Sequence, residues 1–283
     1  MNTKRLYRYF DAKAGRLTLD KCSIKVTPPS QFNDPLEFSP VVRTHNPQAY
    51  AKKKMEKLGT RAHFEAIRDQ LPAGTTWNVY RRTCHNKKST LLRHLANAMP
   101  RLDLSFQKDV LPMISKKWGV ICFSGNPTDP LMWAHYADKH RGIIIEFNGD
   151  DELFDSPNIY EVEYKDDRVV YDPMGSDNQK VLGDLAARKS PHWSYEEESR
   201  LIVKLEEATR LPITDPEGNP IWVLSIEPSL IKSVTLGLRC NKSLGNEYEK
   251  LEAVLDSPPY KNIPVYRIKA DDNKFLLHQD PIR

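Results

Sequence analysis

Short runs of apolar residues alternating with polar ones recur along the chain, and they predict strands more often than helices. Most of these runs are rich in β-branched and aromatic residues, which suit a pleated surface. The predicted strands cover residues 5–10, 22–26, 118–124, 143–147, 158–164, 198–205, 219–228, 233–240 and, as the last one, 263–270. Because they do not alternate regularly with helices, we expect an α+β fold with a mixed, mostly antiparallel sheet and short helices.

A long segment, residues 44–117, differs from the rest of the chain in its composition and its apolar pattern. It is rich in Lys and Arg, its apolar residues have helical spacing, and turn residues interrupt it near 72–76. We interpret it as a helical insertion in a single domain that covers residues 1–283. The strand-rich core of this domain is then formed by residues 1–43 and 118–270.

Shorter elements are predicted from their start and stop signals. In "DPLMWAHYADKHRG", Asp129 suits an N-cap and Pro130 the first helical turn, so a helix is expected to run to about His140 and to end at Gly142. A second helix is expected over residues 243–257. Between the first two strands the pattern predicts a turn near Gly15, without a helix.

Composition places the chain among globular proteins of the cytoplasm. Of its 283 residues, 39% are hydrophobic and 28% are charged. No apolar run approaches the roughly 18 residues of a membrane span, so no membrane partner is expected. The first residues lack the apolar stretch of a signal peptide. The four cysteines are widely scattered, which indicates a reducing compartment without disulfides and gives no reason to expect a metal ion.

The net charge of +4 conceals two blocks of opposite sign. Residues 51–117 contain fifteen Lys and Arg against five Asp and Glu, whereas residues 146–215 contain eighteen acidic against eight basic residues. The basic block could bind nucleic acid, nucleotide phosphates or an acidic partner, with Arg81, Arg82, Lys87 and Lys88 among its cations. It could equally be a solvated helical face that compensates the acidic block.

Three groups of residues can carry chemistry, although phosphate-binding glycine loops and the common hydrolase motifs are absent. The first is the short helix, on which His135 and Tyr136 are candidates for ligand contact. Trp133 on the same helix could stack on a ligand or pack in the core. We expect Met132 to pack in the core. Ser124 ends the preceding strand, and a single serine beside a glycine is a weak signal for a nucleophile.

The second group follows from the alternation of a strand beginning near Glu198, which places Glu196, Glu198 and Arg200 on one face. They could form a solvated ladder of ion pairs, or face a cleft with Glu198 as acid or base and Arg200 as anion holder. The third group is Arg8, which points away from Tyr7 on the first strand and is a candidate anion clamp.

Asn33, Asp34 and Glu37 add polar groups close to this third group in the sequence. Asn33 and Asp34 precede Pro35, so they could simply form a turn, or Asn33 could contact a ligand.

The motifs "LYRY", "SQFNDPLE", "LMWAHYA" and "WSYEEESRLI", in this order, resemble a widespread bacterial family catalogued as a domain of unknown function. The resemblance runs from about Leu6 to Gly237, and the basic insertion is its least matched part.

The segment from "VICFS" to "GIIIEF" also resembles the middle of ADP-ribosyltransferase folds. This resemblance implies that Arg8, Tyr7 and Ser124 position NAD as the substrate, with Asn33, Arg200 and Trp133 as further contacts. It further implies that Tyr136 stacks on nicotinamide and that Glu198 hydrogen-bonds the ribose and stabilises an oxocarbenium-like transition state. The chain departs from that pattern: no His-Gly pair follows the first strand, and no Ser-Thr-Ser triplet stands at Ser124.

The function expected from the resemblance is therefore that of a NAD-consuming, ADP-ribosyltransferase-like enzyme, such as a bacterial toxin or a phage-defence effector. A non-catalytic module that binds a nucleotide or nucleic acid through residues 51–117 is the alternative. A hydrolase that uses Glu196, Glu198 and His135 with a divalent cation is a third interpretation.

Overall fold

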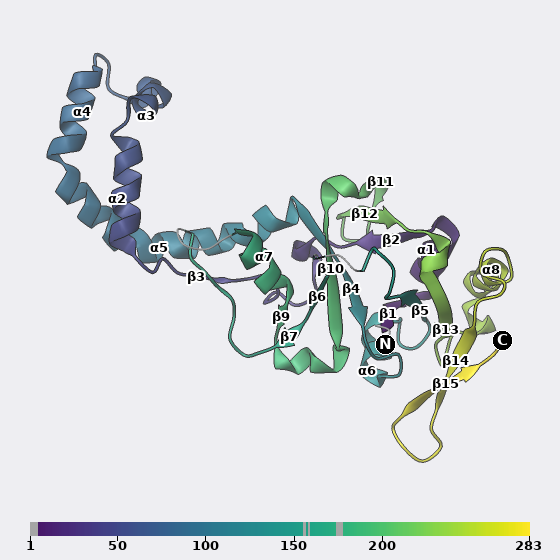
Figure 1. Ribbon diagram of the computed structural model, residues 1–283. Coiled ribbons are helices and arrows are strands. Elements are labelled where there is room, and N and C mark those ends of the chain that lie inside the picture. The colour runs from purple at the N-terminus through teal and green to yellow at the C-terminus, as the bar shows by residue number, and fades with distance from the viewer. Residues whose placement is uncertain (1–4, 155–156, 158, 174–177) are drawn as a thin grey trace. The chain divides into compact units, whose positions relative to one another are not determined.

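The computed structural model describes residues 5–154, 157, 159–173 and 178–283 (Figure 1). The chain divides into two compact units. The first comprises Met1–Phe38, Leu111–Asp167 and Leu182–Arg283, and the second comprises Ser39–Val110 and Arg168–Val181. Both helices and strands are present, and the main sheet is mixed and mostly antiparallel, which confirms the expected α+β class.

The first unit is built on an eight-stranded sheet with the order β15-β14-β13-β5-β1-β4-β10-β6. Its strands are β1 (Arg5–Phe10), β4 (Trp118–Ser124), β5 (Ile143–Asn148), β6 (Ile159–Glu161), β10 (Glu198–Lys204), β13 (Ile231–Leu236), β14 (Val265–Ala270) and β15 (Leu277–Pro281). Only the pair of β13 and β14 is parallel among the pairings described in this sheet. The sequence pattern predicts β1, β4, β5 and β10 almost to the residue, because each is rich in apolar, β-branched or aromatic residues.

The sheet opens between two of its central strands. β1 pairs with β5 along all six of its residues, from Arg5 to Phe10, but it pairs with β4 at Tyr7 and Ser124 alone. β4 continues instead alongside β10 and forms a bridge from Val120 to Thr27, which follows β2 (Ser23–Val26). β1 and β4 therefore diverge beyond their pairing at Tyr7 and Ser124.

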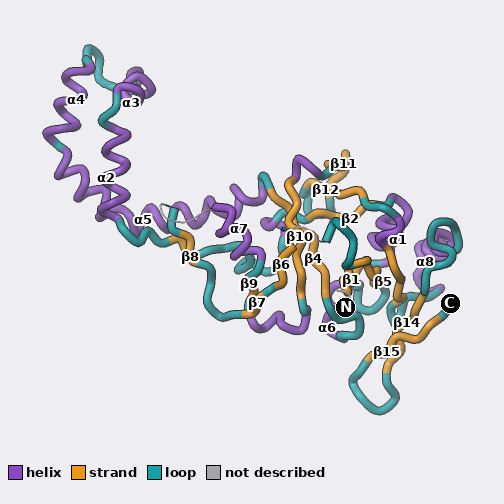
Figure 2. The backbone as a smooth tube through the Cα atoms, in the orientation of Figure 1, coloured by secondary structure: helices purple, strands orange, loops and turns teal. Residues whose placement is uncertain are grey.

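Smaller sheets complete the strand inventory. A three-stranded sheet has the order β11-β12-β2, and two further pairs join β3 to β8 and β7 to β9 (Figure 2). Their remaining strands are β3 (Val41–Val42), β7 (Glu163–Tyr164), β8 (Val170–Tyr171), β9 (Arg188–Lys189), β11 (Thr209–Thr214) and β12 (Pro220–Ser225). The short strand β9 carries Lys189, which lines the cavity described below.

The two faces of β1 contribute to different hydrophobic clusters. Leu6 and Phe10 pack in the larger cluster, and Tyr7 and Tyr9 pack in a smaller one with Trp133 of helix α6 (Pro130–Tyr136). This alternation follows from the two-residue period of a strand. Helix α6 therefore packs on the sheet with one face, and its opposite residues are available to a ligand.

The turn predicted near Gly15 is wrong, because residues Ala12–Lys21 form helix α1 with Asp11 as its N-cap. The buried face of this helix contains Ala12, Gly15, Thr18 and Leu19, of which only Leu19 is a large apolar residue. A Cβ on Gly15 would lie 2.5 Å from Ile143, so the small residue lets the helix approach β5. The periodicity rule could not detect a helix that packs through such residues.

Helix α6 ends at Tyr136, four residues before the predicted end at His140. Three left-handed residues follow it, Asp138, Lys139 and His140, with φ of 45°, 53° and 69°. Gly142 does not cap the helix. A Cβ at this position would lie 1.9 Å from the carbonyl oxygen of Phe10, so the glycine permits close contact with the end of β1.

The C-terminal part of the first unit contains helix α8 (Asn246–Leu255), within the predicted range, and two strands. The strand predicted over 263–270 is present as β14, but the prediction that it is the last strand is wrong. A further strand, β15, pairs antiparallel with β14 from Tyr266 to Ala270. β15 has the sequence LHQDP, which lacks apolar alternation and includes a proline that an edge strand tolerates.

The second unit is mainly helical. Its helices are α2 (Pro47–Leu58), α3 (Arg61–Ala66) and α4 (Trp77–Asn86), with the first part of α5 (Lys88–Ser115) and of α7 (Asn178–Ala186). Phe64 packs against Trp77 and Tyr80, with ring centroids 5.7 and 5.3 Å away. No helix in the described ranges has both the length and the apolar character needed to cross a membrane.

Candidate functional site

A cavity of about 400 Å³ lies in the first unit, lined by residues of β1, β4, β10 and α6. Eight of the predicted site residues line it: Tyr7, Arg8, Asn33, Ser124, His135, Tyr136, Glu198 and Arg200. Its volume falls in the range of small-molecule sites, roughly 300–1,000 Å³. Residues distant in the sequence, from the first strand to the tenth, therefore meet around one space.

Trp133 is the predicted site residue that does not line the cavity. Its side chain is fully buried, and its indole Nε1 donates a 2.9 Å hydrogen bond to the carbonyl oxygen of Pro127. Its ring meets Tyr9 edge-on at 5.4 Å and stacks on His140 at 6.3 Å. Trp133 fixes helix α6 on the sheet, and it is His135 and Tyr136 on the same helix that border the cavity.

Arg8 forms no ion pair with the residues that the structure describes. Its guanidinium carbon lies 5.4 Å from the centre of the Phe10 ring, and its Nη1 atom is buried with no hydrogen-bond partner among the described residues. Burial lowers the pKa of Arg8 to about 10, so the group remains charged at neutral pH. Because a buried charge without a partner is costly, its retention at a cavity wall indicates a site for an anion.

Gln31 presents a second unsatisfied atom at the same cavity. Its Nε2 donates to the carbonyl oxygen of Pro220 at 3.4 Å, which orients the amide, and its Oε1 is buried without a partner in the described part of the chain. A ligand that donates an N–H or O–H could satisfy it. Sequence reasoning missed Gln31, since nothing in "PSQF" marks a glutamine as buried.

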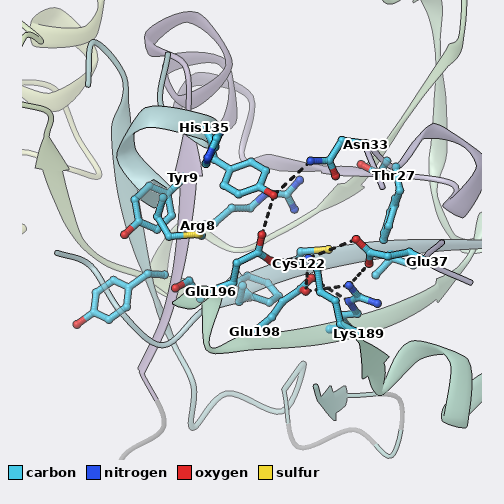
Figure 3. Close-up of a pocket in the computed structure, with 18 of the residues that line it drawn as sticks. Arg8, Tyr9, Thr27, Asn33, Glu37, Cys122, His135, Lys189, Glu196 and Glu198 are labelled. Atoms are coloured by element: carbon cyan, nitrogen blue, oxygen red, sulfur yellow. Dashed lines mark hydrogen bonds and ion pairs between the residues drawn. The ribbon is translucent and has the colours of Figure 1, made fainter. Parts of the chain in front are cut away.

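A network of five buried charged side chains forms another part of the wall (Figure 3). Arg200 donates from Nε and Nη2 to both oxygens of Glu198, each at 2.8 Å, and it also pairs with Glu37. Lys189 contacts Glu196 at 2.5 Å, Glu198 at 3.1 Å and Glu37 at 3.3 Å. The network joins two cations to three carboxylates, so it carries a net negative charge when all three are ionised.

Local backbone geometry explains how the three residues of "EEESR" reach the network. Glu198 and Arg200 are two apart on β10 and share a face, as the strand period requires. Glu196 ends a 3-10 helix (Pro191–Glu196), and the left-handed Glu197, with φ of 44°, separates it from the strand. Glu198 and Arg200 share a face of one strand, as predicted, whereas Glu196 lies outside the strand and joins the network through Lys189. Their interpretation as a solvated ladder is wrong, because Arg200 is 0% exposed.

The charges of the network stabilise one another. Burial alone would raise the pKa of Glu198, but Arg200 and Lys189 outweigh it and lower this pKa to about 2. Burial opposes the charge of Lys189 too, yet its three carboxylate partners raise its pKa above the ordinary value. Glu198 is therefore a fixed anion, both of whose oxygens are already bound.

Glu196 differs from Glu198 in its electrostatics and its neighbours. Burial raises the pKa of Glu196, and Lys189 offsets only part of this effect. Its Oε1 accepts a 2.7 Å hydrogen bond from the hydroxyl of Tyr136, whose oxygen in turn accepts a 3.4 Å hydrogen bond from Asn33. A carboxylate with a raised pKa beside a cavity is suited to exchange a proton with a ligand.

The remaining predicted residues have clear local roles. The hydroxyl of Ser124 accepts from the backbone N–H of Asn126 at 3.1 Å and donates to its carbonyl oxygen at 3.2 Å, so it closes the turn after β4. The hydroxyl of Tyr7 donates to Glu146 at 3.5 Å. His135 is exposed at the cavity rim, with its ring 6.2 Å from that of Tyr136.

Lys189 and Glu37 were not among the predicted ligand-contacting residues. A lysine in "ARKS" carries no local sign of burial, and only the contact of β9 with the 3-10 helix brings it to the carboxylates. Within the described ranges, no group of three or more His, Cys, Asp or Glu side chains is arranged to hold a metal ion. The acidic side chains at the cavity instead bind Lys189 and Arg200.

Comparison with known proteins gives one finding. Residues 132–201 match a family model described as "Protein of unknown function (DUF2971)". Neither the curated proteins nor the solved structures contain a significant match to the chain. The matched segment begins in helix α6 and ends in β10, so it includes Tyr136, Glu196 and Glu198. This match supports placing the chain in an uncharacterised domain-of-unknown-function family.

Proposed function

We propose that the cavity binds NAD and that the protein cleaves its bond between nicotinamide and ribose, as an ADP-ribosyltransferase or a NAD glycohydrolase does. The observation that carries the proposal is Arg8, whose Nη1 atom is buried at the cavity wall with no hydrogen-bond partner among the described residues. Arginine is suited to phosphate because its planar fork matches two oxygens at once. The pyrophosphate of NAD supplies such an anion.

Charge complementarity extends the argument to the other end of the ligand. The network around Glu196 and Glu198 has three carboxylates against two cations, and it lines the same cavity as Arg8. NAD has the opposite arrangement, since its pyrophosphate is anionic and its nicotinamide ring is cationic. The ring of Tyr136 beside Glu196 offers a face on which a cationic ring can stack.

The chemical step needs no oxidant and no metal ion for its balance. The bond between nicotinamide N1 and ribose C1′ breaks, and neutral nicotinamide leaves with the electron pair. Positive charge then develops on C1′ and its ring oxygen, and the carboxylates stabilise it. Water or an acceptor group forms the new bond to C1′ and gives its proton to Glu196, whose raised pKa makes it the better base of the pair.

In this proposal Glu198 is a positioning residue. Its pKa is lowered to about 2, so it is a weak base, and it binds Arg200 and Lys189, the cations that orient Glu196 and Glu37. This refines the role implied by the resemblance, in which Glu198 contacts the ribose. Depletion of NAD by such an enzyme suits a toxin or phage-defence effector acting in the cytoplasm.

The test is to incubate the full chain with NAD and to measure released nicotinamide by chromatography, together with transfer of ADP-ribose to added protein. Wild type is expected to release nicotinamide, and Arg8→Gln and Glu196→Gln are expected to lose at least about 100-fold of the rate. Arg141→Gln and Glu163→Gln, at exposed positions, are matched controls that keep the rate. Absence of both release and transfer with wild type overturns the proposal.

A further inference from the structure

The helical unit carries a concentration of positive charge that the proposed NAD chemistry does not use. Residues 47–88, which form α2, α3 and α4, contain ten Lys and Arg against three Asp and Glu. Several of these cations are balanced locally. Arg61 and Arg68 both lie near Glu65, with N–O distances of 3.7 and 3.8 Å.

Other cations of this unit line a hollow between α2 and α4. A cavity of about 650 Å³ is bordered on the α4 side by Arg81, Arg82 and His85, with Lys88 at the start of α5. We call this feature the basic groove. Its α2 side includes Glu56, the only carboxylate among its described lining residues. The groove therefore has three permanent positive charges against one negative charge.

The cations of the basic groove are available to a ligand. Arg81, Arg82, His85 and Lys88 are exposed, and none of them forms an ion pair with a residue in the described ranges. Arg81 and His85 are four residues apart on α4 and so share a face of that helix, and Lys88 at the start of α5 lines the same groove. Unpaired cations along one groove present repeated binding points.

The walls of the groove are held in place by packing. The hydroxyl of Tyr80 donates a 2.8 Å hydrogen bond to the carbonyl oxygen of Leu58, which ties α4 to the end of α2. Phe64 is buried between these helices and contacts Trp77 and Tyr80. These rings pack against one another, so they are not free to stack on bases or to anchor a protein partner.

We propose that the basic groove binds the phosphate backbone of a nucleic acid. Arg and Lys side chains in a row suit successive phosphates, because each phosphate carries a charge and accepts hydrogen bonds. The polar lining favours a polyanion over an apolar protein surface, and the packed rings favour contacts with the backbone over readout of bases. The site is in the helical unit and is independent of the proposed NAD cavity.

The test uses the full chain and three fluorescein-labelled probes of about 20 nucleotides: single-stranded RNA, single-stranded DNA and duplex DNA. Binding is followed by fluorescence anisotropy between 50 and 200 mM salt. We expect affinity for at least one probe, with a logarithm that falls linearly with the logarithm of the salt concentration. The probe that binds most tightly identifies which nucleic acid the groove prefers.

Two triple variants locate the site. Removing Arg81, Arg82 and Lys88 as R81Q/R82Q/K88Q is expected to weaken binding at least tenfold at 100 mM salt and to reduce the salt slope by about 2 to 3. The matched control K52Q/R61Q/R68Q removes three exposed charges outside the groove and is expected to weaken binding less than threefold.

Two outcomes overturn the proposal. One is the absence of binding to all three probes at 50 mM salt, and the other is an equal loss in the two variants. Circular dichroism verifies that both variants fold. Because the groove variant is expected to keep the wild-type rate of nicotinamide release, failure here and failure of the NAD proposal are distinguished by separate measurements.

Discussion

The hydroxyl of Tyr136 donates a 2.7 Å hydrogen bond to Oε1 of Glu196, which joins helix α6 to the 3-10 helix before β10. The two residues are 60 positions apart and border one cavity. This hydrogen bond stabilises the ionised form of a carboxyl group whose pKa burial raises. It thus links an aromatic surface for the ligand to the proposed base.

Tyr136→Phe should therefore change the pH dependence of the reaction as well as its rate. Loss of the hydrogen bond raises the pKa of Glu196 further, so the acidic limb of the pH–rate profile moves to higher pH. Nicotinamide release between pH 4 and 9 measures this shift. Tyr50→Phe, at a position outside the cavity, serves as the control and should leave the limb in place.

Arg8→Met should make the protein more stable while removing its activity. The substitution removes a buried Nη1 atom that has no partner among the described residues and keeps an apolar side chain, so the free energy of unfolding should rise by about 1 kcal/mol. Urea denaturation measures the change, with Arg8→Lys as a variant that retains the cation. A fall in stability of the Met variant would show that Arg8 has a structural partner.

Arg200→Met should be strongly destabilising. Arg200 binds Glu198 and Glu37 with its side chain fully buried, and its loss leaves both carboxylates without this partner. The expected cost is about 3–5 kcal/mol in the free energy of unfolding. Arg210→Met, on the exposed strand β11, removes the same group and should change stability by less than about 0.5 kcal/mol. Equal effects of the two substitutions would contradict the assignment.

The difference in the free energy of unfolding between wild type and Glu198→Gln should become smaller as the pH falls. The pKa of Glu198 is about 2 in the folded protein against an ordinary value of 4.5. Stability from this ionised group is fully present above about pH 5 and is lost as the pH falls toward 2, and it is on the order of 3 kcal/mol. Urea unfolding of both proteins at pH 7, 5, 4 and 3 gives the difference, and a constant difference would refute this linkage.

Gly142→Ala should destabilise the protein without touching the cavity. The added Cβ would lie 1.9 Å from the backbone oxygen of Phe10, which cannot move without disturbing β1. We expect a loss of about 1–3 kcal/mol in thermal or urea unfolding. Gly59→Ala, where the nearest atom is 3.5 Å from the added Cβ, is the control and should be nearly neutral.

The sequence predicted the parts of the fold that local patterns determine. β4 and β5 are continuous apolar runs, so their positions were correct within a residue. Helix α1 was missed because it packs through Ala12, Gly15 and Thr18, which do not stand out as apolar. The predicted helix α6 was longer than the observed one, because the sequence does not reveal the left-handed residues that begin at Asp138.

The site was predictable where one strand presents several chemical groups. Alternation predicted that Glu198 and Arg200 share a face of one strand and that Arg8 points away from Tyr7 on another. In the structure these side chains line one cavity. Lys189 could not be predicted in the same way, because its role depends on a two-residue strand meeting a 3-10 helix. Burial of the ion pairs could not be predicted either, because an alternating pattern shows which residues share a face but not what covers that face.

The most direct test of the NAD site is a crystal structure of the protein soaked with NAD or with an analogue that resists cleavage. The account predicts electron density in the cavity with the pyrophosphate against Nη1 of Arg8, the nicotinamide against Tyr136, and the ribose beside Glu196. Ligand bound elsewhere on the molecule, or a cavity without ligand at saturating concentration, would contradict it.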